Sequence, residues 1–201
     1  MLLLLIIILL TIFLLIYCIN KSNEQQQYKD VKTFNDISPF PISLYLEKDF
    51  PLNISYRPSA KKNRSLQMTR ILPLVVKHYN ERLDWKVFVL NDERARQLII
   101  REEVPNGTCK KFDGPGGILA HSFYPRIGQI CLDTDEIFSD LELYQILIHE
   151  IGHSLGSMHR IPMFCKDYGE TIMSPVYNKS IMGLTECDVQ FFKKYYPFMH
   201  Q

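Results

Sequence analysis

Three histidines and a glutamate in one short stretch have the types and the spacing of a catalytic metal site. Residues 149–159 read HEIGHSLGSMH. In a helix His149 and His153 lie one turn apart on the same face, so both imidazoles can reach one cation. Gly156 tolerates the left-handed conformation that ends a helix and reverses the chain, and this reversal would return His159 as a third ligand.

This ligand set predicts the chemistry as well as the metal. Three protein nitrogens leave the fourth position of a tetrahedral zinc open to water, as in catalytic sites, whereas structural zinc sites are closed. Glu150 directly follows His149 and is placed to hold a metal-bound water rather than to bind the metal. The alternative is a charged helix with incidental histidines, but the added glycine and third histidine make that coincidence improbable.

The composition restricts the class of protein that carries this stretch. The chain has 201 residues with 23 basic and 22 acidic side chains, a net charge of +1, and 12% aromatic residues. Such a balance excludes a polybasic nucleic-acid binder, so we expect no nucleic-acid partner. The length is that of one folded domain with its own core, and we expect it to be a monomer.

The first 19 residues carry no charged side chain and consist mostly of Leu and Ile. This run exceeds the ~7–15 residues of a signal-peptide core and approaches the ~20 that span a bilayer. No small-residue cleavage site follows it, so the sequence favours an uncleaved signal-anchor, with a removed signal peptide as the alternative. Residues 20–40 read as a polar stalk, and the folded domain is expected at 41–201.

Two further features favour the lumenal or extracellular side for this domain. N-glycosylation sequons occur at Asn53, Asn63, Asn106 and Asn178. Beyond the apolar run the cysteines form an even set, as disulfides require: Cys109, Cys131, Cys165 and Cys187. We therefore expect a protein of the secretory pathway that is membrane-anchored through its N-terminal segment, or secreted if that segment is removed.

Hydrophobic periodicity predicts the helices that must position the metal ligands. Apolar residues at helical spacing predict a helix over 67–83, which Pro73 must start or kink. The helix that carries the metal stretch begins at Ser139, whose hydroxyl can form a capping box with Glu142. A last helix begins at Thr185 and ends at the next proline.

Short runs rich in Val, Ile and Phe predict the strands. They fall at residues 52–56, 85–90, 97–101, 118–123 and 129–133. Strands and one helix come first, and two helices follow. This order predicts an α+β domain.

The extended histidine stretch resembles the zinc-binding motif of the metzincin metallopeptidases. Residues 171–177, TIMSPVY, resemble the Met-turn of that clan with Met173 as its methionine, and the Met-x-Pro-x-Tyr context is typical of the matrixins. Residues 113–123 and 133–136 resemble matrixin segments ahead of the active-site helix. The likeness implies a metzincin-like catalytic domain, with a twisted mixed sheet of about five strands and three helices. It also implies a zinc endopeptidase acting on protein or peptide substrates.

The chain departs from the matrixin pattern at a second zinc. Matrixins hold a structural zinc with three His and one Asp, and of these positions only His121 matches. The others are occupied by Asn106, Thr108 and Cys131. We therefore expect a single zinc per chain, the catalytic one. The favoured use of the nearby thiols is a Cys109–Cys131 disulfide, although sequence alone does not fix connectivity.

The other two cysteines suggest a second bridge. Cys165 lies in the loop after the third histidine, and Cys187 lies in the predicted last helix. We expect these two to pair. The sequence contains no Pro-Arg-Cys-Gly segment, with which the family's propeptide blocks the zinc, so we expect another route of regulation or an enzyme active as made.

The resemblance also implies a structural calcium. Its oxygen ligands would be the carboxylates of Asp113, Asp133 and Glu136 and the carbonyls of Gly114, Gly116 and Ile118. The alternative is a solvated acidic turn. The family's other calcium loop is shortened here, with Gln129 where an Asp is expected, so we predict no calcium there.

The substrate-binding residues are likewise implied by the resemblance. The strand at 118–123, with Leu119 and Ala120, would offer an edge to which an extended peptide adds as a further strand. Pro175 and Tyr177 would form one wall of the pocket for the residue after the cleaved bond. Gln145, one turn before His149, would line its floor.

Two functions from different classes follow. The favoured one is a zinc endopeptidase in which Glu150 acts as general base. The alternative is a membrane-anchored binding or structural protein that keeps a metzincin fold without turnover, and the lost structural zinc site gives it some support. The intact Glu150 opposes that alternative, because a pure metal scaffold has no need for a carboxylate there.

Overall fold

The computed structural model describes residues 44–91, 94, 96–102, 109, 112–159, 165 and 169–200. The expected membrane segment at 1–19 and stalk at 20–40 lie outside this part of the chain, as does the sequon at Asn106. Within it, no helix combines the length and the apolar character needed to cross a bilayer.

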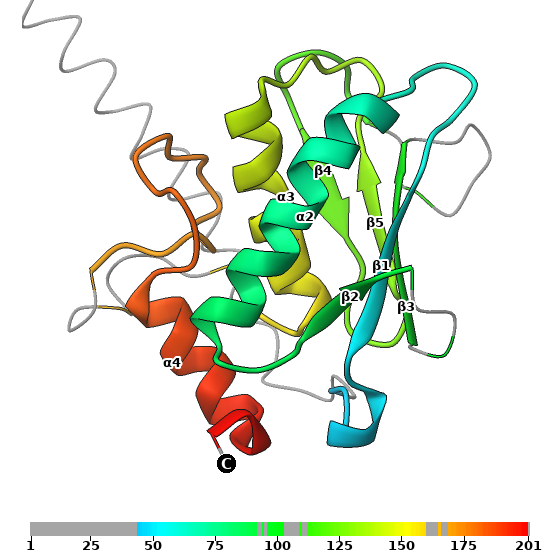
Figure 1. The fold of residues 1–201 in the computed structure, drawn as a ribbon. Coiled ribbons are helices and arrows are strands. Elements are labelled where there is room, and N and C mark those ends of the chain that lie inside the picture. The colour runs from blue at the N-terminus through cyan, green and yellow to red at the C-terminus, as the bar shows by residue number, and fades with distance from the viewer. Residues whose placement is uncertain are drawn as a thin grey trace, which may run out of the picture. The chain divides into compact units, whose positions relative to one another are not determined.

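The described strands form one mixed sheet in the order β2-β1-β3-β5-β4 (Figure 1). Strands β2, β1, β3 and β5 run parallel to their neighbours, and β4 pairs antiparallel with β5 at one edge. Their bounds are β1 Leu52–Arg57, β2 Phe88–Leu90, β3 Arg96–Glu102, β4 Ala120–Ser122 and β5 Gln129–Leu132. The predicted α+β class with a mixed sheet is confirmed.

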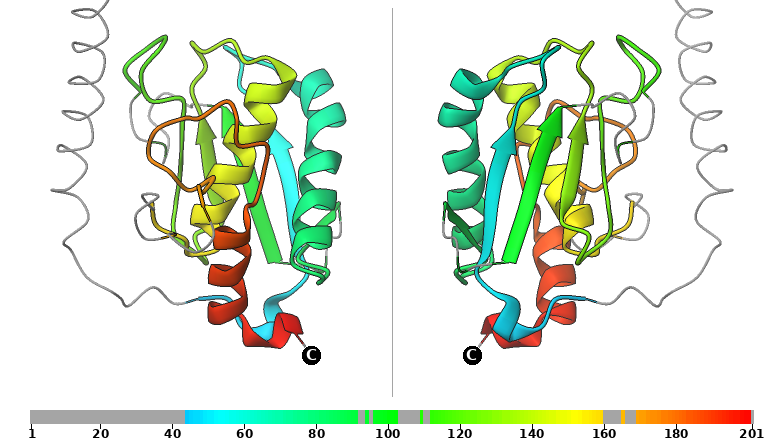
Figure 2. Two further views of the ribbon diagram at one scale, coloured as in Figure 1. Left: turned by 90° about the vertical axis from the view of Figure 1, so that its left-hand side faces the viewer. Right: turned by 90° about the vertical axis from the view of Figure 1, so that its right-hand side faces the viewer.

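Two long helices lie side by side against one face of this sheet (Figure 2). They are α2, Ser65–Arg82, and α3, Asp140–Ser154. A third helix, α4, spans Glu186–Tyr195, and short 3-10 turns cover Glu47–Asp49 and Pro197–His200. The core lies between helices and sheet and includes Ile54, Val75, Tyr79, Leu98, Ile100, Ile130, Leu147, Ile148 and Ile151, each fully buried.

Helix α2 begins two residues before the predicted start and runs through Pro73. Of the two alternatives expected for Pro73, a helix start or a kink, the start is therefore excluded. Pro73 lies on the exposed side of α2, between the buried pairs Ile71/Leu72 and Val75/Val76. On that side water can serve the carbonyl that loses its helical partner, which is why the proline is tolerated there.

Strand β2 is shorter than predicted, because it begins only at Phe88. The Asn80 amide accepts from the Phe88 N–H and donates to the Phe88 carbonyl, each at 2.9 Å. Val87 N–H instead bonds to the Trp85 carbonyl in a turn. Residues 85–87 lie outside β2. The Trp85 N–H donates to the Asn80 carbonyl of α2 at 3.2 Å, and the Val87 carbonyl accepts from the Leu52 N–H of β1 at 2.8 Å.

Both predicted helix starts are confirmed. Glu142 N–H donates to the Ser139 hydroxyl at 3.2 Å while the Ser139 N–H donates to the Glu142 carboxylate at 3.0 Å, a reciprocal capping box. At α4, the Thr185 N–H donates to the Asp188 carboxylate at 2.9 Å. The helix that carries the histidines therefore starts at a residue fixed by local hydrogen bonds.

The two expected disulfides are present in the structure, Cys109–Cys131 and Cys165–Cys187. The predicted glycosylation sequons differ in burial. Asn53 lies in β1 with 5% of its surface exposed, so the folded domain cannot carry a glycan there. Asn63 is exposed and Asn178 half-buried, and glycosylation at these two stays a prediction.

Candidate metal centre

Three imidazoles converge at the end of helix α3. The Nε2 atom of His149 lies 3.0 Å from that of His153 and 3.2 Å from that of His159. Two nitrogens bound to one tetrahedral zinc at ~2.0–2.1 Å are about 3.3 Å apart, so the spacing fits a single ion. The predicted ligand set is thus brought together, with two ligands from α3 and one from the segment that follows it.

Backbone carbonyls orient the two helical imidazoles. The Nδ1 of His149 donates to the Ile172 carbonyl at 2.7 Å, and that of His153 donates to the Ser157 carbonyl at 2.6 Å. A ring that donates from Nδ1 keeps the lone pair on Nε2, the atom that faces the other histidines. The site is therefore set in the tautomer that binds a cation.

Burial keeps these rings neutral. It lowers the pKa of His149, lowers that of His153 well below its usual range, and lowers that of His159 to about 4. The neighbouring rings also lower the pKa of His153 and His159, because charged imidazoles side by side repel each other. Neutral imidazole is the form that binds a metal ion.

Glu150 is the buried acid of the site. Its side chain is 6% exposed, and its Oε2 atom has no hydrogen-bond partner among the described residues. Burial raises its pKa to about 8. A buried carboxylate oxygen without a partner is costly, and a metal-bound water beside it would supply the missing donor. The residues present fit a catalytic zinc with its water.

The turn after α3 requires glycine at position 156. Gly156 has φ +94°, and a Cβ there would lie 2.6 Å from Leu44 Cδ2. Its N–H donates to the His153 carbonyl, and the Ser157 N–H donates to the Gly152 carbonyl. This reversal is what returns His159 toward the helix, as the spacing predicts.

Below the histidines lies the predicted Met-turn. Met173 is fully buried, and a Cβ on Gly152 of α3 would lie 2.4 Å from its sulfur. The Met-turn therefore packs directly against helix α3 at Gly152, between the predicted ligands His149 and His153. Glycine at position 152 is what permits this close approach.

Asp188 holds the Met-turn, a role that the sequence does not reveal beyond its place in the capping box. Its carboxylate is fully buried and accepts from the Ile172 N–H at 3.1 Å and from the Thr171 hydroxyl. Ile172 in turn offers its carbonyl to His149. A single buried carboxylate thus connects α4 to the predicted ligand His149 through one residue, Ile172.

Comparison with known protein families identifies the family to which this chain belongs. The matrixin family profile matches residues 59–197, more than half of the chain. The chain belongs to the matrixin family. The predicted family is confirmed, and the α+β architecture is that of its catalytic domain.

Curated relatives of this matrixin chain are similar over part of its length. Stromelysin-3 of Rattus norvegicus is 41% identical over 95 residues, 44% of this chain and 18% of the relative. Stromelysin-3 of Homo sapiens is 46% identical over 78 residues, 35% of this chain and 16% of the relative. A putative matrix metalloproteinase of Trichoplusia ni ascovirus 2c is 30% identical over 120 residues, 49% of this chain and 23% of the relative. The chain thus spans less than a quarter of each.

The residues expected to bind substrate lie in or beside strand β4, in helix α3 and in the segment after Met173. Ala120 is in the edge strand β4, and Leu119 precedes it with its carbonyl bonded to the Asp133 N–H. The Ser122 hydroxyl lies 2.6 Å from that of Ser154, which ties β4 to helix α3. Within the described sheet β4 has a neighbour on one side only, as the predicted edge for an added peptide strand requires.

Gln145 is held by three hydrogen bonds at the predicted pocket floor. It is 1% exposed, its Nε2 donates to the carbonyls of Ile181 and Lys179, and its Oε1 accepts from the Tyr177 hydroxyl at 2.6 Å. Tyr177 itself is 36% exposed. One hydrogen bond therefore joins Gln145, the predicted floor of the substrate pocket, to Tyr177, its predicted wall.

The residues expected to bind calcium are brought into neighbouring turns. Asp113 accepts from the Ile118 N–H at 2.8 Å, and Glu136 accepts from the Gly116 N–H. Asp133 Oδ2 is buried without a partner among the described residues. In that part of the chain, however, these three carboxylates do not form a group with all ligand atoms within 4.8 Å.

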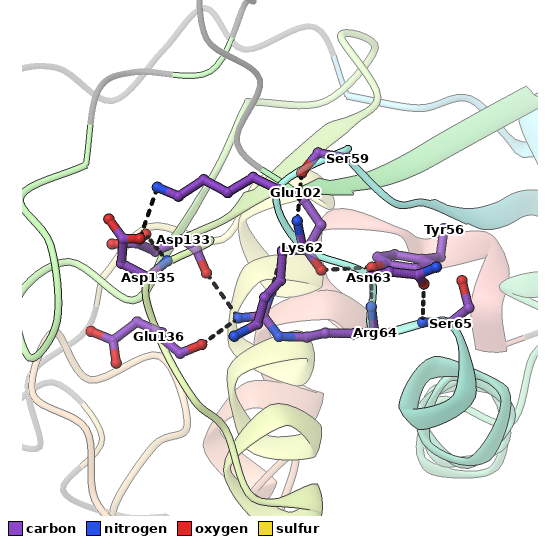
Figure 3. A network of polar contacts seen from close by, with 11 residues as sticks. Tyr56, Ser59, Lys62, Asn63, Arg64, Ser65, Glu102, Asp133, Asp135 and Glu136 are labelled. Atoms are coloured by element: carbon purple, nitrogen blue, oxygen red, sulfur yellow. Dashed lines mark hydrogen bonds and ion pairs between the residues drawn. The ribbon is translucent and has the colours of Figure 1, made fainter.

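A buried arginine supports the same turn (Figure 3). Arg64 pairs with Glu102 of strand β3 and donates to the carbonyls of Asp133 and Glu136 at 2.9 and 2.7 Å. The guanidinium thus holds the turn by its backbone, and the Asp133 side chain stays available for another partner.

Proposed function

We propose that this matrixin chain is a zinc-dependent endopeptidase that hydrolyses peptide bonds in extended protein substrates. The convergence of three Nε2 atoms, with the buried Glu150 whose Oε2 has no partner among the described residues, is the observation that carries the proposal. A purely structural zinc site would be closed by a fourth protein ligand. Here the described residues offer three.

Each residue has a defined part in this reaction. His149, His153 and His159 would hold the zinc, which when bound lowers the pKa of its water toward ~7 and polarises the scissile carbonyl. Glu150 takes the proton of that water at its carboxylate and passes it to the leaving nitrogen, a role worth typically ~10²–10⁴-fold. Edge strand β4 would align the peptide as an additional antiparallel strand.

A cleavage assay tests the proposal directly. The zinc-loaded protein is incubated with a library of unstructured peptides, and the products are identified by mass spectrometry. We expect internal cleavages that stop when a zinc chelator is added and resume when zinc is restored. A fully metallated, folded protein that cleaves no peptide would favour the alternative, a binding protein that keeps the fold without turnover.

The metal content provides a separate prediction. We expect one zinc per oxidised chain, because His121 is the only retained position of the family's second site and its neighbours Cys109 and Cys131 are joined. His121→Ala should leave the zinc content of the oxidised protein unchanged. Elemental analysis decides the matter, and two equivalents in the oxidised protein would contradict it.

The pocket floor predicts the preference for the residue after the cleaved bond. Gln145→Ala removes the amide that ties Tyr177 to Ile181 and opens the space beneath it. We compare two peptide substrates, one with a long and one with a short side chain after the cleaved bond. The ratio of kcat/KM for the long to the short substrate should rise about 10-fold, since ~1–3 kcal/mol per methylene is typical of apolar pockets. Tyr177→Phe keeps the floor and should shift the ratio less. An unchanged ratio in Gln145→Ala would place the floor elsewhere.

We also propose a structural calcium at the turn near Asp133, supported by its buried, unpartnered Oδ2. Saturating Ca²⁺ should stabilise the protein by about 2–3 kcal/mol, the value for a ligand near 100 times its Kd, and raise its Tm by several degrees. Asp133→Asn should abolish this rise, whereas Asp135→Asn, at an exposed carboxylate paired with Lys61, should not. A Ca²⁺ response equal in all three proteins would contradict the site.

We also propose that the protein enters the secretory pathway. Two disulfides support an oxidising compartment, and the apolar residues 1–19 would direct the chain there and anchor it unless they are removed. The domain would then face the lumen or the exterior, where protein substrates are met.

A further inference from the structure

A second group of metal-ligating side chains lies away from the catalytic histidines. Among the described residues, Cys109, His121 and Cys131 each offer a ligand atom, and these atoms all lie within 4.8 Å of one another. The two sulfurs are joined as a disulfide. The ring of His121 therefore lies beside the bridge rather than on the other side of the sheet.

The backbone holds two of these residues in fixed register. His121 in β4 and Cys131 in β5 are directly opposite each other in the antiparallel pair. The Cα atoms of Cys109 and Cys131 are 5.9 Å apart. Two thiolates on one zinc lie about 3.8 Å apart, given Zn–S bonds of ~2.3 Å, and rotation about the two Cα–Cβ bonds can supply that separation without moving the strands.

The surroundings favour a neutral complex. The His121 ring packs against Phe112 and Phe123, with ring centroids 4.9 and 5.7 Å away. Gln129 Nε2 donates to the sulfurs of Cys109 and Cys131 at 3.5 and 3.3 Å. Two thiolates and a neutral imidazole balance the charge of a divalent cation, so such a complex would bury no net charge between the aromatic rings.

We propose that reduction of the Cys109–Cys131 bridge converts this group into a second cation site, with two thiolates and the His121 imidazole as ligands and water as the fourth. Its occupant is a divalent cation that prefers sulfur and nitrogen, zinc above all. The protein then holds one zinc when oxidised and two when reduced. The inference is independent of peptidase activity.

The chemistry balances with a dithiol as reductant. Thiol–disulfide exchange passes two electrons to the bridge, so that Cys109 and Cys131 become thiols and the dithiol becomes a cyclic disulfide. Binding of the cation then releases the two thiol protons, because the thiolate is the ligand. The reverse exchange, with a disulfide as the oxidant that accepts the two electrons, expels the cation and restores the bridge.

Cobalt(II) distinguishes this site from the catalytic one. Only a site with thiolate ligands gives a sulfur-to-cobalt charge-transfer band in the near ultraviolet, and the catalytic site has nitrogen ligands alone. The full-length protein is loaded with Co²⁺ before and after treatment with a water-soluble phosphine, which reduces the bridge and takes up oxygen from water. We expect one cobalt and no such band when oxidised, and two cobalt with the band when reduced.

Matched variants locate the second cation. His121→Ala and His121→Phe should each lower the reduced protein to one cobalt and remove most of the band, while the visible spectrum of the catalytic site reports that the fold is intact. The double variant Cys165→Ser/Cys187→Ser, which removes the other bridge, should keep both cobalt ions and the band. The proposal is overturned by a single cobalt in the reduced protein, by a band that survives in both His121 variants, or by a band lost in the Cys165/Cys187 control.

Discussion

Replacement of Glu150 by glutamine is expected to lower peptide hydrolysis at least ~10²-fold, the lower end of general-base effects. Glutamine keeps the shape of the side chain but cannot take a proton from water. The zinc content should stay at one per chain, because the proposed ligands are His149, His153 and His159. Activity and zinc are measured on the same preparation, with Glu81→Gln at an exposed position of α2 as control.

The pH dependence of stability gives this substitution an independent signature. Burial raises the pKa of Glu150 from 4.5 to about 8, so between these values the folded metal-free protein binds more protons at this site than the unfolded chain does. Its stability therefore falls as pH rises through that window. Glu150→Gln lacks this loss, so the metal-free variant should gain stability relative to the unaltered protein from pH 5 to pH 8.

These two measurements test the role of Glu150 separately from the zinc peptidase activity of the protein. If Glu150→Gln hydrolyses peptides as fast as the unaltered protein, the general base has been assigned wrongly although zinc peptidase chemistry survives. If its zinc is lost as well, Glu150 is a ligand rather than a base. A stability difference that is constant over pH would show that this carboxyl is less buried than the structure has it.

The second large effect is expected for His153→Ala. His153 is the second of the three proposed ligands along the chain, with its Nε2 3.0 Å from that of His149 and its Nδ1 fixed by the Ser157 carbonyl. Removing it should lower zinc affinity by more than the ~10–100-fold typical of losing an outer partner of a ligand, and activity should fall below detection. Zinc titration against a competing chelator measures the affinity.

His78→Gln serves as the matched control. His78 accepts the Leu184 N–H at 2.9 Å outside the metal centre, and glutamine can still accept there. This variant should keep zinc and activity near those of the unaltered protein. Retention of full zinc affinity by His153→Ala would mean that the metal is held elsewhere in the chain.

The parts of the site that the sequence predicted are those that local chemistry determines. The spacing of His149 and His153 on a helix, the glycine at 156 and the capping box at Ser139 each act within about one turn, and the structure agrees with all of them. The disulfides were predicted from an even cysteine set and a resemblance. Cys131 and Cys187 lie in a strand and a helix that were also predicted.

What escaped prediction depends on contacts between distant segments. Asp188 reads as a capping residue, yet it fixes the Met-turn because α4 packs beneath residues 171–173. Asn53 reads as a glycan acceptor, yet it lies in a strand with neighbours on both sides. Asn80 reads as one polar position of a helix, yet its amide bonds both backbone polar groups of Phe88 in β2. No pattern along the chain reports such tertiary partners.

The approach of Leu44 to the turn at Gly156 bears on how this catalytic domain can be exchanged between genes. The family match starts at residue 59, but Tyr45 is 3% exposed and β1, at 52–57, is paired on both sides within the sheet. A recombination event joining a foreign leader at residue 59 would remove an inner strand and the side chain that backs the zinc turn. A transferable module must therefore include at least the residues from 44 onward, fifteen residues upstream of the recognisable homology.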